Sequence, residues 1–163
     1  MAVINVSAGS EAVIMLGDSA ANANVAAAAS DGLLLPQMQD ITINNSTGVF
    51  RFKTLDNTAE SAVTTPATNQ ITINAVVDSA SFFGTGAGSI DTVVDTGVLG
   101  VSTSKTRVYF QAAFDGRDAG SKYLSGSGFI SGLAPTVNMD SPVWVTPITI
   151  EVDGDYTEGV VAA

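Results

Sequence analysis

Apolar residues stand at every second position in several segments of this chain, the spacing that places them on one face of a β-strand. The clearest sets are Ile71, Ile73 and Ala75; Val108, Phe110, Ala112 and Phe114; and Ile148, Ile150 and Val152. They predict strands over residues 70–77, 105–115 and 142–152. A strand of this kind buries one face and exposes the other, so the pattern favours an antiparallel sheet with a one-sided core.

Residues 38–55 carry the pattern of a β-hairpin. Ile41 and Ile43 share one face of the first segment, and Phe50 and Phe52 alternate with charged residues in the second. The turn-forming residues 45–48 (Asn-Ser-Thr-Gly) lie between the two segments, so we expect the hairpin to turn there.

A polar stretch rich in Thr and Ala extends from Asp56 to Asn69, with Pro66 near its end. Its composition predicts a long loop. Long loops inside a compact domain are often functional, so this segment is a candidate contact site.

One helix is expected in the second half of the chain. Ser89 stands at a suitable N-cap position, and four apolar residues follow at helical spacing: Ile90, Val93, Val94 and Val98. We expect this helix to end near Gly97 or Gly100, because glycine is common at helix C-termini.

Further short strands are expected at residues 3–6, 12–16 and 122–133, whereas residues 18–32 fit either a loop or a short helix. The fold class predicted is mainly β: an antiparallel β-sandwich or partial barrel of about seven strands with one packed α-helix. The 163 residues are expected to form a single domain. No role is assigned to the Ala/Asn-rich segment 1–37.

The charge of the chain disfavours most kinds of catalysis and DNA binding. The chain contains sixteen acidic and six basic residues, for a formal net charge of −10, and it contains no His and no Cys. Without His and Cys the chain cannot supply an imidazole base, a thiol nucleophile or most kinds of zinc site, so we expect no enzyme, no cofactor and no metal. A protein that grips DNA needs clustered cations, which this chain lacks. No segment is long and apolar enough to span a bilayer, so no membrane partner is expected.

Three local features bear on possible binding sites. The glycine-rich residues 84–88 lack the third glycine of a dinucleotide-binding loop and are expected to form a linker. The acidic stretch 153–158 lacks the central glycine and final Glu of a calcium loop. Trp144 is expected in the core rather than on a ligand platform.

Five features in the second half of the chain occur in a distinctive order. The expected helix 90–99 precedes the strand 106–114, and the phrase Gly-Phe-Ile-Ser-Gly-Leu follows at 128–133. An acidic turn at 139–142 then leads to a final alternating strand that ends at Gly154. This order resembles phage major tail tube proteins of the siphophage or gene-transfer-agent type. The resemblance covers residues 40–155.

The resemblance implies a β-sandwich subunit of the virion that is made in the bacterial host cytoplasm. Such subunits assemble into stacked, hexameric rings that form the tail tube, the conduit for DNA delivery. The partners implied are ring neighbours, stacked rings, a tail terminator and tail tip or baseplate proteins. DNA would pass through without specific binding.

Two sets of site residues follow from this hypothesis. The expected acidic lining of the lumen comprises Asp40, Asp56, Asp78, Asp140 and Asp153. The expected contact between rings lies in the loop 56–69, with candidates Asn57, Thr58, Glu60, Thr64, Thr65 and Pro66. Two alternatives remain open: a capsid decoration or fibre subunit, and a glycosidase that uses two carboxylates.

Overall fold

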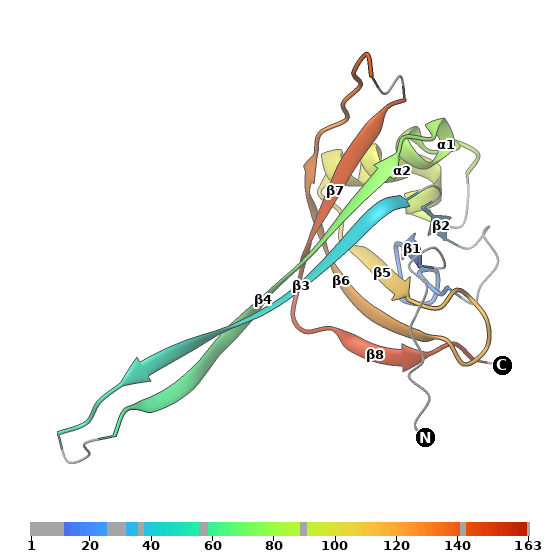
Figure 1. Cartoon of the computed structure of the whole chain (residues 1–163). Helices are drawn as coiled ribbons and strands as arrows, with labels where there is room; N and C mark the ends of the chain where they lie inside the picture. The colour runs from blue at the N-terminus through green and yellow to red at the C-terminus, as the bar shows by residue number, and fades with distance from the viewer. Residues whose placement is uncertain are drawn as a thin grey trace.

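The computed structural model describes residues 12–25, 32–35, 38–55, 59–88, 91–140 and 143–162. These residues form a mainly β fold, as the sequence predicts (Figure 1). The elements are β1 (Val13–Gly17), β2 (Leu33–Leu34), β3 (Met38–Phe52), β4 (Ser61–Val76), α1 (Ser79–Phe83), α2 (Thr92–Ser104), β5 (Val108–Ala113), β6 (Lys122–Leu133), β7 (Val145–Val152) and β8 (Thr157–Val160).

The strands form one antiparallel sheet in the order β2-β1-β5-β6-β7-β4-β3, with β8 paired to β6 outside this order. β6 joins the two halves of the sheet. Its residues 123–128 pair with β5, residues 128–133 pair with β7, and residues 122–125 pair with β8. A single strand therefore contributes to both halves, and the sheet is not closed into a barrel.

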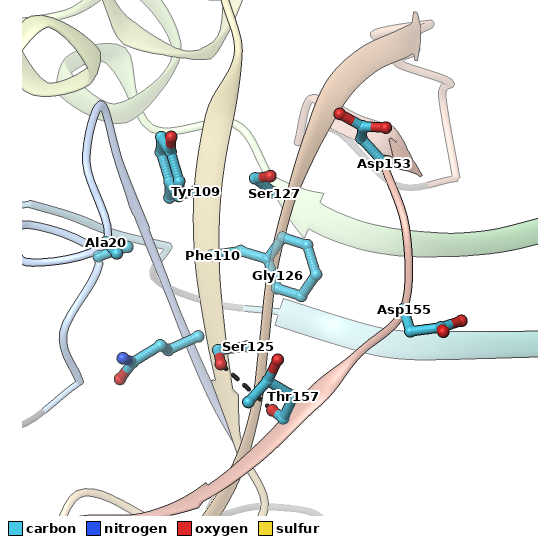
Figure 2. A pocket seen from close by; sticks show the side chains of 11 residues that line it. Ala20, Tyr109, Phe110, Ser125, Gly126, Ser127, Asp153, Asp155 and Thr157 are labelled. Carbon is cyan, nitrogen blue, oxygen red and sulfur yellow. Dashed lines mark hydrogen bonds between the residues drawn. The ribbon is translucent and has the colours of Figure 1, made fainter.

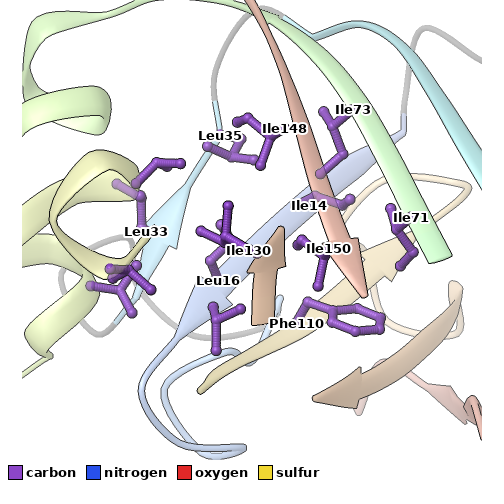
Figure 3. Close-up of a cluster of buried hydrophobic side chains, with 14 of the residues drawn as sticks. Ile14, Leu16, Leu33, Leu35, Ile71, Ile73, Phe110, Ile130, Ile148 and Ile150 are labelled. Atoms are coloured by element: carbon purple, nitrogen blue, oxygen red, sulfur yellow. The ribbon is translucent and has the colours of Figure 1, made fainter. Parts of the chain in front are cut away.

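The core lies on one face of this sheet and beneath α2 (Figure 3). The alternating residues predicted from sequence fill it: Ile71, Ile73, Ala75, Val108, Phe110, Ala112, Ile148 and Ile150 are all buried. Ile14 and Leu16 of β1 and the α2 residues Val93, Val98 and Val101 complete the cluster. Phe114 was expected to share the face of Phe110, but it follows the end of β5 and is exposed.

Helix α2 begins and ends later than predicted. Asp91, not Ser89, is the N-cap, because its carboxylate accepts hydrogen bonds from the backbone N–H groups of Val93 and Val94. Ser89 lies outside the described residues. The helix continues to Ser104, and Gly97 produces a kink within it, with φ 66° and ψ 178°. A Cβ at position 97 would lie 2.4 Å from the backbone nitrogen of Gly84, so only glycine fits there.

Three elements were missed because they are too short to show periodicity: α1, β8 and the two-residue strand β2. Helix α1 has five residues, and its N-cap is Asp78, whose side chain accepts a hydrogen bond from the N–H of Ser81. Strand β8 begins inside the acidic stretch 153–158, and it pairs with the start of β6. The described residues therefore form two helices, α1 and α2, where the sequence predicted only the second.

The hairpin turn predicted at residues 45–48 is wrong. These residues lie inside β3, which runs unbroken to Phe52 and pairs with β4 from Ser61 onward. The expected loop 56–69 is likewise strand from residue 61 onward. The polar composition of these two segments suggested loops. They lack apolar residues because both faces of the ribbon are exposed to solvent, and not because their backbone is irregular.

Trp144 also departs from expectation, because it is 52% exposed and does not join the core. A second, smaller apolar cluster covers the other side of β1 and β5 and contains Met15, Val25, Ala113 and Val161. Among the described residues, no helix has the length and apolar character needed to cross a membrane. The predicted strand 3–6 lies outside the described residues.

Candidate functional site

The β3–β4 hairpin projects far beyond the body of the molecule (Figure 1). Its inner half belongs to the core, because Ile71 and Ile73 are fully buried and pair with Ile43 and Ile41. Its outer half, residues 44–55 and 59–68, is called the hairpin arm below. No described residue of the arm is buried. The arm therefore contributes almost nothing to the core of its own subunit.

A turn near the C-terminus holds the root of the arm. The Tyr156 hydroxyl lies 2.9 Å from the carbonyl oxygen of Asn44 and 3.1 Å from that of Gln70, which are paired residues on β3 and β4. One pair farther out, the side-chain amide of Asn69 donates a 2.8 Å hydrogen bond to the carbonyl oxygen of Gly154. Burial raises the pKa of Tyr156 above its usual value, although its contact with Gln70 acts the other way. The hydroxyl thus stays protonated, and the direction of the arm is fixed where it leaves the body.

One face of the arm carries an exposed apolar patch formed by Phe50, Phe52 and Val63. The rings of Phe50 and Phe52 are stacked with centroids 6.2 Å apart, and Phe50 pairs with Val63 across the ribbon. These side chains are 61%, 38% and 53% exposed, respectively. Three large apolar groups on an extension without a core are typical of a contact surface.

The other face of the arm is more polar. Val49 and Arg51 alternate with the phenylalanines, and Arg51 forms an exposed ion pair with Glu60 at 3.7 Å. A bulge interrupts the pairing near Gly48, where an added Cβ would lie 2.1 Å from the Thr65 hydroxyl oxygen. A bulge at this position increases the local twist of the ribbon.

The predicted contact residues between rings fall on this arm. Thr64, Thr65 and Pro66 lie in its β4 strand, and Glu60 lies just before that strand. Asn57 and Thr58 lie outside the described residues. The chain segment predicted to be functional is therefore the arm, although as strand rather than loop.

A second surface lies on the sheet face opposite the core, across β3, β4 and β7. The register aligns Asp40 with Asn74 and Pro147, and Gln70 with Glu151. This face, called the polar face below, comprises Asp40, Thr42, Asn44, Gln70, Thr72, Asn74, Pro147, Thr149 and Glu151. Lys and Arg are absent from this set, so its formal charge is negative.

The two carboxylates of the polar face accept hydrogen bonds from uncharged groups. Asn74 donates to both carboxylate oxygens of Asp40 at 2.9 Å, and Gln70 donates to Glu151 at 2.6 Å. Elsewhere, Asp153 is paired with Arg107 and Glu158 with Lys122. An amide orients a carboxylate without cancelling its charge, so the polar face stays negative while those other carboxylates are neutralised.

The structure separates the five carboxylates predicted for the lumen. Asp40 lies on the polar face, Asp78 caps α1, and Asp140 lies exposed in the connection that leads into β7. Asp153 lies beyond the opposite end of β7, and Asp56 lies outside the described residues. Sequence reasoning missed Glu151. Its signal was its place between the apolar residues Ile150 and Val152, on the outward side of an alternating strand.

A shallow hollow of about 290 Å³ lies between the 18–25 segment, β5, β6 and the C-terminal turn (Figure 2). Tyr109, Ser125, Ser127, Asp153 and Asp155 line it. The Ser125 hydroxyl donates to the carbonyl oxygen of Thr157 at 3.2 Å, rather than to a base that could activate it. Across the described ranges, no three metal-ligating side chains come together. The hollow therefore lacks the elements of a catalytic or metal centre.

One buried carboxylate has a structural role instead. Asp91 is fully buried, and its second oxygen accepts the backbone N–H of Asp18 at 2.8 Å. Asp18 in turn accepts from the N–H of Thr92 at 3.1 Å. Burial acts to raise the pKa of Asp18, but hydrogen bonds from Thr92 and Asn22 outweigh it, and the net pKa is lowered. These reciprocal bonds connect the end of β1 to the start of α2.

The fold is shared along nearly its whole length with proteins of virus-like tails. It matches the tail of an empty gene transfer agent particle, refined with C6 symmetry, with a TM-score of 0.65 and 9% identity over 93% of this chain and 98% of that one. A chain of the native gene transfer agent virion matches with a TM-score of 0.63 and 10% identity, over 94% and 99% of the two chains.

The SPP1 tail tube gives a TM-score of 0.63 and 11% identity over 97% of this chain and 81% of that one. No protein-family model matches the sequence, and no curated protein matches it either. At these identities the likeness establishes the fold. The tail tube resemblance that the sequence phrases indicated is thereby confirmed for the fold of the chain.

Proposed function

We propose that this chain is a structural virion protein that assembles into stacked, hexameric rings and forms the tail tube through which DNA is delivered. The observation that carries the proposal is the hairpin arm, a long extension that has exposed apolar groups and no buried residue among those described. The tail tube fold supports the same conclusion, and the C6 symmetry of one matching tail supports a six-membered ring.

Ring closure is proposed to use the edges of the sheet. β3 has fifteen residues and, within the described residues, pairs only with β4. A long unpaired edge of this kind is a template for pairing with another chain. Pairing between neighbouring copies around a closed ring leaves no free edge, as in a large barrel.

The lumen is proposed to be negative, with the polar face as its lining. No cation cancels the charge of Asp40 and Glu151 among the described residues, where only neutral amides and a hydroxyl donate hydrogen bonds to them. Asp78 and Asp140 are exposed and lie near the ends of β4 and β7 that pair with each other; both are weaker candidates for the lining of the lumen. Asp153 is also a weaker candidate, because it is ion-paired with Arg107. A negative wall repels phosphate and lets DNA slide. Screening over about 8 Å at physiological salt restricts the effect to side chains that line the channel.

The arm is proposed to connect successive rings. Thr64, Thr65, Pro66 and Glu60 would lie in this contact. At the ends of the tube, the same surfaces would meet a tail terminator and tail tip or baseplate proteins. The protein would act in the phage tail as a structural component.

Microscopy and mass measurement of the purified chain test this proposal. We expect negative-stain images to show hollow tubes or rings of uniform diameter, and mass photometry to show hexamers or larger species. Isolated trimers would favour the capsid decoration alternative, and solid fibres would favour a fibre subunit. A chain that stays monomeric at high concentration and forms no tubes would refute the proposal.

A further inference from the structure

An apolar groove lies beside α1, which is at the end of the molecule remote from the hairpin arm (α1 is labelled in Figure 1). It has a volume of about 400 Å³ and is lined by Val77, Phe82, Phe83, Pro135 and Trp144. Phe83 is 61% exposed and Trp144 is 52% exposed, so the two aromatic walls are open to solvent. Every lining residue is apolar or aromatic, and none of these residues takes part in the main core cluster.

The groove and the apolar patch of the arm match in chemistry. The patch presents two stacked phenylalanine rings and a valine on a ribbon two strands wide. The groove offers aromatic and aliphatic walls in a volume that suits side chains of this size. Aromatic pairs in contact are worth more than their buried area alone, through stacked and edge-to-face arrangements.

Charge also favours this pairing over other contacts between copies. Residues 44–69 contain Arg51, Lys53, Asp56 and Glu60, so their formal net charge is zero. The whole −10 charge of the chain therefore resides in the other residues. Two copies of an acidic body repel each other, whereas an uncharged arm approaches an acidic body without that cost.

We infer that the apolar patch of one subunit docks in the aromatic groove of a second copy of this chain. The inference rests on the proposed tube function and names the surface that receives the arm. The patch and groove lie at opposite ends of one molecule, so each copy can use both at once. A contact between two different surfaces propagates from copy to copy, which is the geometry that stacked rings require.

Cysteine cross-linking tests the contact without background, because the chain contains no Cys. We would combine Val63→Cys on the arm with Phe83→Cys on the groove and treat assembled particles with a short bismaleimide. We expect a ladder of covalent dimers, trimers and longer species on denaturing gels. The matched control combines Val63→Cys with Val160→Cys on β8, which is 55% exposed but lies away from the groove, and it should stay monomeric.

The outcomes separate this inference from the proposed function. Tubes that form normally but give no ladder, or links only within single chains, would overturn the docking and leave the tube function standing. A failure of the unmodified chain to form rings or tubes would overturn both. A ladder as strong with Val160→Cys would show nonspecific contact and would also overturn the docking.

Substitutions in the patch give a second measurement that does not depend on cross-linking. Phe50→Ser with Phe52→Ser should raise the protein concentration needed for tube formation at least tenfold, which corresponds to about 1.4 kcal/mol. The control is Val49→Ser, which removes an apolar residue of similar exposure from the other face of the same strand. It should change that concentration less than twofold. Equal effects of the two changes would refute the role of the patch.

Discussion

Removing the hairpin arm should abolish tube formation while leaving the subunit folded. Asn45 and Asn69 are paired residues at its root, so residues 46–68 can be replaced with an Asn-Gly turn that closes a two-residue hairpin loop. The shortened chain keeps Asn44 and Gln70, so the hydrogen bonds from the Tyr156 hydroxyl to their carbonyl oxygens remain. The shortened chain thus keeps every core contact of the inner hairpin.

The expected loss of stability is small, because no described residue between 46 and 68 is buried. The ion pair of Arg51 with Glu60 is exposed on both sides and contributes at most about 1 kcal/mol. An isolated two-stranded ribbon is marginally stable by itself. We therefore expect the free energy of unfolding to change by no more than about 1 kcal/mol, a shift in Tm of about 2–4 °C.

A longer deletion, which extends into the core, serves as the comparison for the loss of stability. Joining Thr42 to Thr72 with the same turn removes three further pairs, including the one that contains the fully buried Ile71. Loss of a buried isoleucine costs about 2–5 kcal/mol, so this variant should be clearly destabilised. Guanidinium unfolding followed by circular dichroism measures both variants at a concentration where the subunit is unassembled.

Assembly of the first variant is then measured by sedimentation and negative-stain microscopy. We expect folded subunits or single rings and no elongated tubes. Full-length tubes from the shortened chain would refute a role of the arm in stacking. A stability loss of about 3 kcal/mol or more in the first variant would refute the reasoning that the arm lies outside the core.

Three further predictions concern carboxylates. Asp91→Ala leaves three backbone N–H groups without their partner and should lower the free energy of unfolding by about 3 kcal/mol. Asp91→Asn keeps the two bonds of the N-cap and should lower it by about half as much. Guanidinium unfolding measures both effects. Asp18 has a lowered pKa in the folded chain, so its contribution to stability is present above its ordinary pKa of about 3.9 and is lost as the pH falls through the lower folded value. An acid titration of Asp18→Asn should therefore lose part of the stability decline below about pH 4, and an unchanged profile would contradict this account. Replacing both Asp40 and Glu151 with Lys should leave tubes intact but make them retain DNA at low salt and release it at high salt, in a filter-binding assay; tubes that bind no DNA would argue that the polar face lies outside the lumen.

Part of the proposed contact surface could be predicted from the sequence. The polar residues 56–69 are predicted to be a contact segment because they offer no core residues, and the structure places 61–68 on the arm. Their strand conformation could not be inferred, because a ribbon with both faces exposed lacks the alternation that reveals a strand. The apolar patch was visible as Phe50 and Phe52, but local pattern placed a turn just before them. Only the register with β4 shows that β3 continues through residues 45–48.

The carboxylates predicted for the lumen also show what local sequence pattern can and cannot reveal. The prediction of Asp40, Asp56 and Asp78 rests on their place at the end of an alternating strand, and that of Asp140 and Asp153 on their place near the last two strands. Neither criterion reveals the partner of a carboxylate. Asp78 proved to cap a helix and Asp153 to pair with Arg107, which lies 46 residues away along the chain. Glu151 was passed over because it lies inside a strand. Cross-strand neighbours decide whether a carboxylate keeps its charge, and those neighbours are distant in sequence.

The sequence by itself determined the mainly β class and the inward-facing residues of β4, β5 and β7. Period-two alternation depends only on the geometry of one strand and the cost of exposing apolar side chains, both of which are local. It also determined the acidity and the lack of imidazole and thiol chemistry. The tertiary structure alone decided the strand order, the length of the arm, the exposure of Trp144 and the groove around it. These features depend on pairing and packing between residues far apart in the chain, and no local pattern encodes which partner each strand edge or aromatic side chain will meet.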